Sequence, residues 1–292
     1  MYYEIFSIIA PVFVCAFIGF IWVKLGQTFA ADFASKIIVY ISTPCLIFST
    51  FMEVDIDRSA FLNLLLAAVL TTLCSGLIAW PVLKILKQDL HAFLPSQIFP
   101  NCGNMGLPLC LLAFGEEGLA LGITFFTINA VSHFSVGASI SAGQLSFKNL
   151  LKNPIFVAVL ITLIMVFNGI KSPVWLYNST ELLGGISIPM MLIALGVSLA
   201  QFKISSLKLS LALSIFRLVT GFVVGVGITL LLGLEGAARG VVILQSTMPI
   251  AVFAYLFASQ NNRRPDEVAG TVVISTILSF LTLPLLLLYI LP

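Results

Sequence analysis

Apolar runs of about 20 residues follow one another along the whole chain, and few charged residues interrupt them. Hydrophobic residues make up 60% of the 292 residues and charged residues only 9%. A soluble domain of this size has too little interior to hide so much apolar surface, whereas a lipid bilayer accommodates it. A helix needs about 20 mostly apolar residues to cross the hydrocarbon core. The pattern therefore predicts an all-α membrane protein with about ten transmembrane helices.

The charged connections divide the chain into ten predicted spans. Their approximate limits are 3–24, 30–51, 59–86, 90–114, 117–139, 153–170, 174–201, 206–232, 236–260 and 267–290.

Basic residues are concentrated on one side of this predicted arrangement. The even-numbered connections hold Arg58, Lys171 and Arg239. The odd-numbered connections hold Lys24, Lys84, Lys87, Lys148, Lys152, Lys203, Lys208, Arg263 and Arg264. Because cytoplasmic loops are enriched in Lys and Arg, the odd-numbered connections are predicted to be cytoplasmic. Both chain termini then lie outside the cytoplasm.

An internal repeat relates the two halves of the chain. The second predicted span contains Ile41-Ser42-Thr43-Pro44, and the seventh contains Ile186-Ser187-Ile188-Pro189, at an offset of 145 residues. Five spans in each half is an odd number, so the second half must be inserted upside down relative to the first. Inverted repeats of this kind are typical of secondary transporters. The predicted division is a first repeat over 1–140, a cytoplasmic linker over 141–152 and a second repeat over 153–292.

Two predicted spans contain residues that break helices. In the fourth span these are Pro100, Gly103, Gly106 and Pro108, with the polar Asn101 and Asn104 between them, and in the ninth span Pro249 follows Gln245-Ser246-Thr247. Proline removes a backbone donor, and glycine and asparagine tolerate non-helical backbone. Both clusters fall near the predicted middle of the membrane, where irregular backbone is tolerated only if it is buried in protein or lines a cavity. Proline kinks that only help helices to pack are the alternative interpretation.

Interrupted helices at corresponding positions of two repeats indicate the binding site of a transporter. If the two helices cross, two half-helix N-termini meet, each with free N–H groups and partial positive charge. Such a site favours an anion, typically a carboxylate, without needing a buried Lys or Arg. The predicted substrate-binding residues are Asn101, Asn104, Gln245, Ser246, Thr247 and Asn129.

Three polar residues in other parts of the predicted spans each have two possible interpretations. Asn129 either completes the site or forms an interhelical hydrogen bond. His133 lies one turn further along the same face and either bonds to a neighbouring helix or couples transport to protons. Arg217 is a charge inside a span, and therefore a functional candidate, although its long side chain could extend to the cytoplasmic surface.

The segment Pro100-Asn101-Cys102-Gly103-Asn104-Met105-Gly106-Leu107-Pro108-Leu109 resembles the fourth-helix signature of the auxin efflux carrier family. Ser42-x-Pro44 and Thr247-Met248-Pro249-Ile250-Ala251-Val252 also resemble that family. The resemblance implies ten helices in inverted five-helix repeats, as in NhaA and the bile acid symporters. It also implies a scaffold of helices 1, 2, 6 and 7 and a moving transport part of helices 3–5 and 8–10. In the plant branch, the asparagine at the position of Asn101 contacts the substrate carboxylate.

The long cytoplasmic loop of many plant carriers is missing, because only residues 140–153 are available for it. The resemblance therefore implies a bacterial-type permease of the inner membrane, for small organic anions such as auxin-like carboxylates or dicarboxylates rather than for auxin itself. A homodimer through the scaffold helices would fit this fold.

The sequence favours a secondary transporter of small organic anions that works by an elevator-type mechanism. Neither enzyme motifs such as HExxH and GxSxG nor a nucleotide-binding P-loop is present, so no enzyme, ATP-driven pump or cofactor is expected. Basic runs that would indicate nucleic acid binding are also missing. The alternatives are a sodium-coupled anion symporter of the bile acid type and a membrane ligand sensor that does not transport. Coupling to protons or to sodium is left open.

Overall fold

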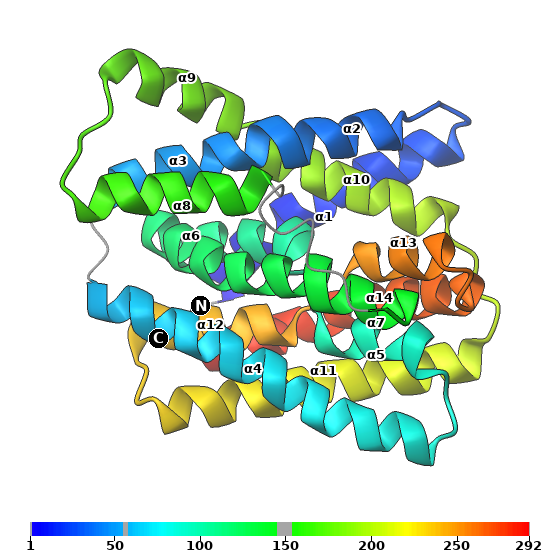
Figure 1. The fold of residues 1–292 in the computed structure, drawn as a ribbon. Helices are drawn as coiled ribbons and strands as arrows, with labels where there is room; N and C mark the ends of the chain where they lie inside the picture. The colour runs from blue at the N-terminus through cyan, green and yellow to red at the C-terminus, as the bar shows by residue number, and fades with distance from the viewer. Residues whose placement is uncertain (1, 55–57, 145–153, 292) are drawn as a thin grey trace.

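The structure is a computed structural model that describes residues 2–54, 58–144 and 154–291. Within these ranges the chain is helical, and three short π-helical segments (η1 to η3) interrupt its α-helices (Figure 1). The elements of the first half are α1 (Tyr2–Lys24), α2 (Ala31–Ile37), η1 (Ile38–Ser42), α3 (Thr43–Glu53), α4 (Arg58–Ile85), α5 (Leu90–Ile98), η2 (Cys102–Gly106), α6 (Leu107–Ser132), η3 (His133–Gly137) and α7 (Ala138–Ala142). Those of the second half are α8 (Pro154–Phe167), α9 (Val174–Gly184), α10 (Ser187–Gln201), α11 (Leu207–Leu231), α12 (Gly236–Thr247), α13 (Val252–Gln260) and α14 (Pro265–Ile290).

Seven helical stretches among the described residues are long and apolar enough to cross a membrane. They are Tyr3–Lys24, Ala31–Glu53, Ser59–Ile85, Cys102–Ala142, Val174–Gln201, Leu207–Leu231 and Pro265–Ile290. The other predicted spans are shorter in the structure: α5 and α13 have 9 residues each, α12 has 12 and α8 has 14. The breaks predicted near Pro100 and Pro249 are the reason for the short lengths of α5, α12 and α13.

The longest of these stretches, Cys102–Ala142, folds back on itself at Gly115. This glycine has φ 66° and ψ −158°, which is not helical and which residues with a side chain avoid. A Cβ atom on Gly122 would lie 3.1 Å from the side chain of Cys110. In a straight helix, residues 12 positions apart would be separated by about 18 Å. The part of α6 before Gly115 and the part after it are therefore packed side by side.

The helices pack in two groups. In one group α1 packs along α10, and α3 packs against α8 and α9. In the other, α11 packs against α12 and α14, while α4 packs against α5 and α6. Figure 1 shows α3, α8 and α9 at the top of the bundle and α4 and α11 at the bottom, with α6 between them. Large apolar side chains are exposed around the bundle, as on a surface that faces lipid. They include Phe6, Phe17, Leu77, Leu182 and Leu281.

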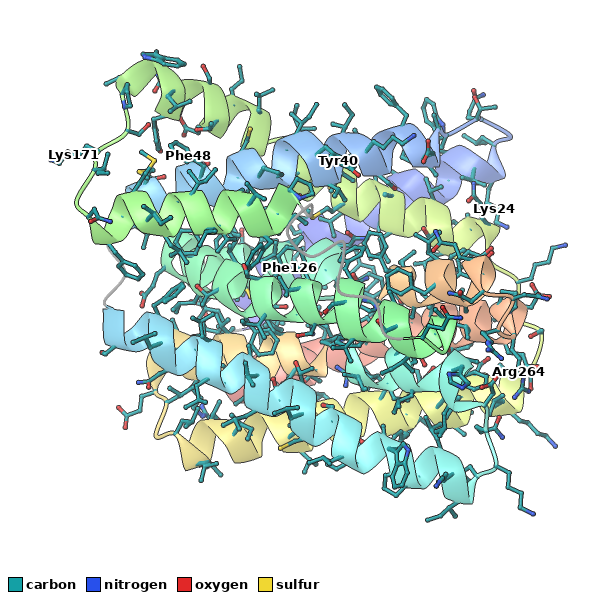
Figure 2. All side chains as sticks on the ribbon, viewed as in Figure 1. Lys24, Tyr40, Phe48, Phe126, Lys171 and Arg264 are labelled. Atoms are coloured by element: carbon teal, nitrogen blue, oxygen red, sulfur yellow. The ribbon has the colours of Figure 1, made fainter. Side chains whose placement is uncertain are left out.

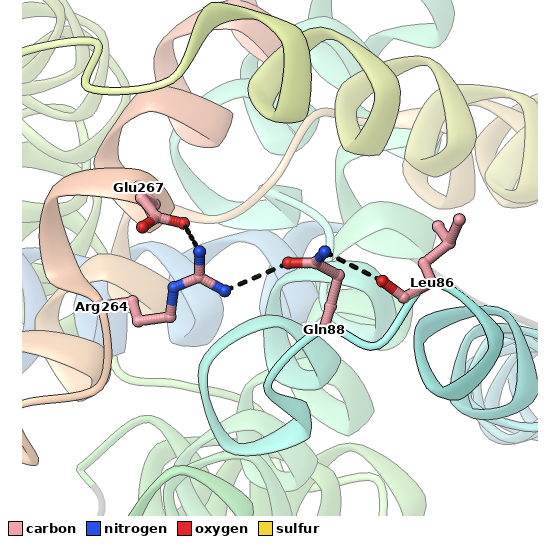
Figure 3. Close-up of polar contacts among 4 residues, drawn as sticks. All are labelled: Leu86, Gln88, Arg264 and Glu267. Carbon is pink, nitrogen blue, oxygen red and sulfur yellow. Dashed lines mark hydrogen bonds and ion pairs between the residues drawn. The ribbon is translucent and has the colours of Figure 1, made fainter.

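Figure 2 shows Lys24 and Arg264 at one end of the bundle and Lys171 at the opposite end. At the first end, the loop after α4 is tied to the start of α14 (Figure 3). Arg264 donates a hydrogen bond of 3.1 Å to Oε1 of Gln88 and forms an ion pair with Glu267. Gln88 in turn donates to the carbonyl of Leu86 over 3.1 Å. The placement of Lys24 and Arg264 at one end and of Lys171 at the other matches the division between odd-numbered and even-numbered connections in the sequence.

Both Ile-Ser-x-Pro motifs lie where a helix begins. Pro44 is in the first turn of α3, directly after η1, and Ser187 is the first residue of α10. The two serines, Ser42 and Ser187, are fully buried. The motifs thus mark local irregularities, a π-helical segment before α3 and a turn before α10, inside helical stretches that are otherwise continuous. The predicted linker 141–152 lies for the most part outside the described residues.

Candidate functional site

Two extended segments cross where the interrupted helices meet. After α5 ends at Ile98, Phe99 is extended and Asn101 turns into η2, and after α12 ends at Thr247, Met248 and Ala251 are extended. The backbone N–H of Asn101 donates to the carbonyl of Pro249 over 2.7 Å, and that of Ala251 donates to the carbonyl of Phe99 over 3.3 Å. Pro100 and Ile250 are therefore opposite each other as an antiparallel bridge. These bonds satisfy backbone groups that would otherwise be unpaired deep in an apolar environment.

The two halves align differently at the crossing than the Ile-Ser-x-Pro motifs suggest. Across the antiparallel bridge between Pro100 and Ile250, Asn101 lies opposite Pro249, and Ala251 lies opposite Phe99. The N–H groups of Asn101 and Ala251 therefore have the same role at the crossing, which aligns these two residues at an offset of 150. The offset of 145 residues, which would pair Asn101 with Ser246, is therefore wrong at this place. Because Ala251 has no polar side chain, the carboxamide of Asn101 has no counterpart in the second half.

Prolines have different roles at the two predicted breaks. Pro249 accepts a crossing hydrogen bond through its carbonyl, and Pro100 accepts one of 2.8 Å from the N–H of Cys102. The sequence placed Pro108 in the break of the fourth span, but Pro108 is not part of the crossing. It lies at the start of α6, directly after η2, inside a helical stretch that begins at Cys102.

A cavity of about 70 Å³ lies at the crossing. Two helix N-termini reach it, because Gly103 and Asn104 belong to the first turn of η2, and Phe253 to the first turn of α13. N–H groups in a first turn have no partner within their own helix. The residues that line the cavity are Ser35, Ile38, Val39, Thr43, Pro100, Asn101, Cys102, Gly103, Asn104, Phe126, Asn129, Ala130, His133, Phe134, Ile155, Met191, Ala194, Ala251 and Phe253. None of these lining residues is Asp, Glu, Lys or Arg.

Three side chains of the cavity wall are buried and have a polar atom without a hydrogen-bond partner. These atoms are Oγ1 of Thr43, Nδ2 of Asn101 and Nε2 of His133. Buried polar atoms are nearly always paired, so these three atoms are candidate contacts for a polar group that enters the cavity. The amide is a donor, and a hydroxyl and an imidazole can each donate.

The cavity brings together only part of the predicted site. Asn101, Asn104, Asn129 and His133 all line it, as does Gly103.

Three residues predicted to bind substrate lie elsewhere. Ser246 and Thr247 donate to the carbonyl of Ile243, one turn back along α12, over 3.1 Å and 2.6 Å. Gln245 donates to the carbonyl of Gly122 over 3.4 Å, and its side-chain end packs directly against Gly106, where a Cβ atom would displace it. None of these three residues lines the cavity, so their binding to substrate stays a prediction without support from the cavity.

His133 is held among aromatic rings at the start of η3. Its ring stacks on Phe99 with centroids 4.5 Å apart, and it meets Phe257 edge-on at 5.2 Å. These contacts fix the imidazole beside the crossing.

Arg217 is buried, with 1% of its surface exposed, so its side chain does not extend to the membrane surface. Its Nη1 donates to the carbonyl of Gln97 over 3.2 Å, and its Nη2 to that of Ser246 over 2.7 Å. Both carbonyls belong to the last turn of a helix that ends at the crossing, α5 in one case and α12 in the other.

Several lining residues were not predicted from the sequence. Thr43 and Ser35 come from the second predicted span, and Phe126, Phe134 and Phe253 supply an aromatic wall. Thr43 lies inside the motif Ser42-x-Pro44, so the sequence contained a signal, but only for a repeat. Among the described residues, no three His, Cys, Asp or Glu side chains come together as metal ligands would.

Comparison with known proteins identifies the family. The family model described as membrane transport protein matches residues 4–146 and 139–287. An uncharacterized transporter of Methanothermobacter thermautotrophicus is 27% identical over 292 residues, covering 95% of each chain. One of Methanocaldococcus jannaschii is 25% identical over 272 residues, covering 87% of this chain and 88% of that one. A protein of Rhizobium meliloti with the name "Putative malonate transporter" is 23% identical over 304 residues, covering 96% of this chain and 93% of its own. The chain belongs to the membrane transport protein family, as a multi-pass permease of the auxin efflux carrier type.

Proposed function

We propose that this protein is a secondary transporter of small organic anions that carry a carboxylate. The single observation that carries the proposal is the cavity at the crossing, where two helix N-termini and three unpartnered polar atoms converge. Each N-terminus contributes roughly half a positive charge and free N–H groups. An anion would pair with these donors without a basic residue in the cavity wall.

The size of the cavity favours a short substrate. One water molecule needs about 10–15 Å³ of such volume, so about 70 Å³ holds a few waters or a small acid. The name of the Rhizobium relative refers to malonate, a three-carbon dicarboxylate. Short mono- and dicarboxylates, with malonate first, are therefore the substrates to test. Auxin, with its fused aromatic rings, is a poorer match.

The proposed architecture has ten spans in two inverted repeats of five. The paired breaks at the crossing support it, and so does the meeting of the two family matches at residues 139–146. The two packing groups support a scaffold of predicted spans 1, 2, 6 and 7, which are α1 to α3 and α8 to α10 in the structure. They also support a transport part of predicted spans 3–5 and 8–10, which are α4 to α7 and α11 to α14. An elevator movement would carry the crossing, as part of the transport group, past the scaffold. The proposed location is the bacterial inner membrane, with both termini outside.

Ligand binding is the first experiment. The purified protein would be heated with a panel of mono- and dicarboxylates, with and without sodium. A ligand present at about 100 times its Kd stabilises the folded state by about 2.7 kcal/mol. A higher Tm with at least one acid is expected, and dependence of that shift on sodium would identify a sodium-coupled symporter. If no acid of the panel raises the Tm, the proposed substrate class is wrong.

Transport is tested with Asn101→Ala in liposomes. Because Asn101 supplies an unpaired carboxamide N–H group at the crossing, we expect exchange of labelled malonate to fall at least about tenfold, with the Tm unchanged. The control is Asn261→Ala, because Asn261 lies at the far end of α13 and donates to the carbonyl of Phe257. Normal exchange by the Asn101 variant would remove this residue from the site. Ligand binding by the native protein without exchange would indicate a sensor.

A further inference from the structure

Arg217 has no acidic partner among the residues that the structure describes. It is among the largest fully buried side chains, and none of the described Asp and Glu residues forms an ion pair with it. A charge buried in a membrane protein is costly unless it has a specific partner or a function. Its only hydrogen bonds among the described residues are those to the carbonyls of Gln97 and Ser246.

Those two carbonyls are at equivalent places in the two interrupted helices. Gln97 precedes the end of α5 by one residue, and Ser246 precedes the end of α12 by one residue. Carbonyls in a last turn have no partner within their helix, and together they form its partially negative end. One guanidinium therefore binds the negative ends of both half-helices.

The sequence of α11 allows this close approach. Gly221 is one turn beyond Arg217, and a Cβ atom at this position would overlap the carbonyl of Ser246. Gly225, one turn further, likewise leaves room for the side chain of Ser246. The backbone of α11 thus lies directly against the end of α12, within reach of Arg217.

The charges at the crossing do not cancel. Four helix ends meet there, two N-terminal ends of about +0.5 each and two C-terminal ends of about −0.5 each, so the backbone contributes roughly zero. Arg217 adds a full positive charge. We infer that Arg217 is the residue that makes the crossing select anions, by neutralising the two negative helix ends so that the two positive ends act on the substrate unopposed. This inference rests on the proposed function.

The wall between Arg217 and the anion cavity is thin. A polar void of about 10 Å³ borders Arg217, and its lining includes Thr71, Ser75 and Asn129. Asn129 and Pro100 line both this void and the anion cavity. No acidic residue lines the void or the cavity, so among these lining residues nothing cancels the positive charge. In such surroundings a charge acts over a longer distance than in water.

The first test changes Arg217 itself. Arg217→Gln keeps amide donors but removes the charge, and Arg217→Lys keeps the charge but loses the planar fork that reaches two carbonyls. We expect the Gln variant to bind malonate at least about tenfold more weakly, and the Lys variant to lose less. The affinity for malonamide, the uncharged analogue, should stay close to that of the native protein in both variants. Thermal unfolding shows whether each variant is folded.

A second test leaves Arg217 in place, so that it can be done even if those variants do not fold. Ser75→Asp would put a negative charge beside Arg217 in the void, and Ser75→Asn would put a neutral group of the same size there. We expect malonate binding to weaken at least about fivefold in the Asp variant relative to the Asn variant. Equal affinities for malonate in the two folded variants would overturn the role of Arg217 and leave the proposed function standing. If the native protein binds no carboxylate, the proposed function is wrong and this inference falls with it.

Discussion

At the scale of single residues, His133 combines burial with an unpaired ring nitrogen. Its ring is fixed by Phe99 and Phe257, while Nε2 has no partner in the cavity wall. A buried polar atom that lacks a partner destabilises the fold, unless a ligand provides the missing bond. His133 is therefore expected to lower the stability of the empty protein and to strengthen anion binding.

His133→Leu tests this opposition. Removing a donor to a charged group costs about 1.5–3 kcal/mol of binding, so the malonate concentration for half-maximal exchange should rise at least about tenfold. The Tm of the empty protein should stay the same or rise, because an unpaired polar group has been replaced by an apolar one. Both quantities can be measured on the same purified protein.

His91→Leu is the matched control, since the His91 ring bonds to the carbonyl of Ile140 over 2.7 Å, away from the cavity. That variant should be slightly less stable and should bind malonate normally. If His133→Leu lowers the Tm and leaves exchange unchanged, His133 is structural.

Residue chemistry explains which site residues could be predicted. Asn101 and Asn104 lie between prolines and glycines, which mark irregular backbone, so their place at a break followed from local sequence. Gln245, Ser246 and Thr247 have the same polarity, yet they lie in the last regular turn of α12 and face inward. The side on which a polar residue lies relative to a break depends on tertiary packing. Sequence alone does not specify it.

At the scale of helices, α1 and α10 pack unusually closely. A Cβ atom on Gly196 of α10 would overlap the carbonyl of Ala16, and one on Gly19 of α1 would overlap that of Ile193. Small residues allow such contact between membrane helices, where van der Waals packing is the main attraction. This pair lies in the group proposed as the scaffold, which must remain rigid while the transport part moves.

Gly196→Ala should separate these two helices. Overpacking at a close contact costs about 1–3 kcal/mol, so thermal unfolding in detergent should occur at a lower temperature. Gly227→Ala in α11 is the control, because no atom lies within 4 Å of a Cβ placed there. Its stability should be unchanged or slightly higher, since alanine favours a helix more than glycine does. Equal Tm values for the two variants would contradict the role of the close contact.

The helices themselves were largely predictable, because long apolar runs and Pro or Gly clusters are local signals. The crossing partner was not, because the bridge from Pro100 to Ile250 joins residues 150 apart in the sequence. The fold of α6 at Gly115 was expected only as a boundary between two spans. Its tight packing of Gly122 on Cys110 depends on contacts that no local pattern encodes.

At the scale of the whole molecule, the two ends of the bundle differ in charge. Lys24 and Arg264 lie at one end and Lys171 at the other (Figure 2). The distribution of basic residues over the odd-numbered connections indicates that the Lys24 end is cytoplasmic.

Labelling with a membrane-impermeant maleimide tests this orientation. Replacing Cys15, Cys45, Cys74, Cys102 and Cys110 by alanine gives a background without thiols. A single Lys171→Cys should then be labelled in intact cells, whereas a single Lys24→Cys should be labelled only after the cells are opened. Both positions are exposed, so burial does not limit the reaction. The reverse result would mean the opposite orientation. Labelling of both positions in intact cells would place the two ends on the same side, against the separation of charge across the bundle and against a membrane-spanning arrangement of these helices.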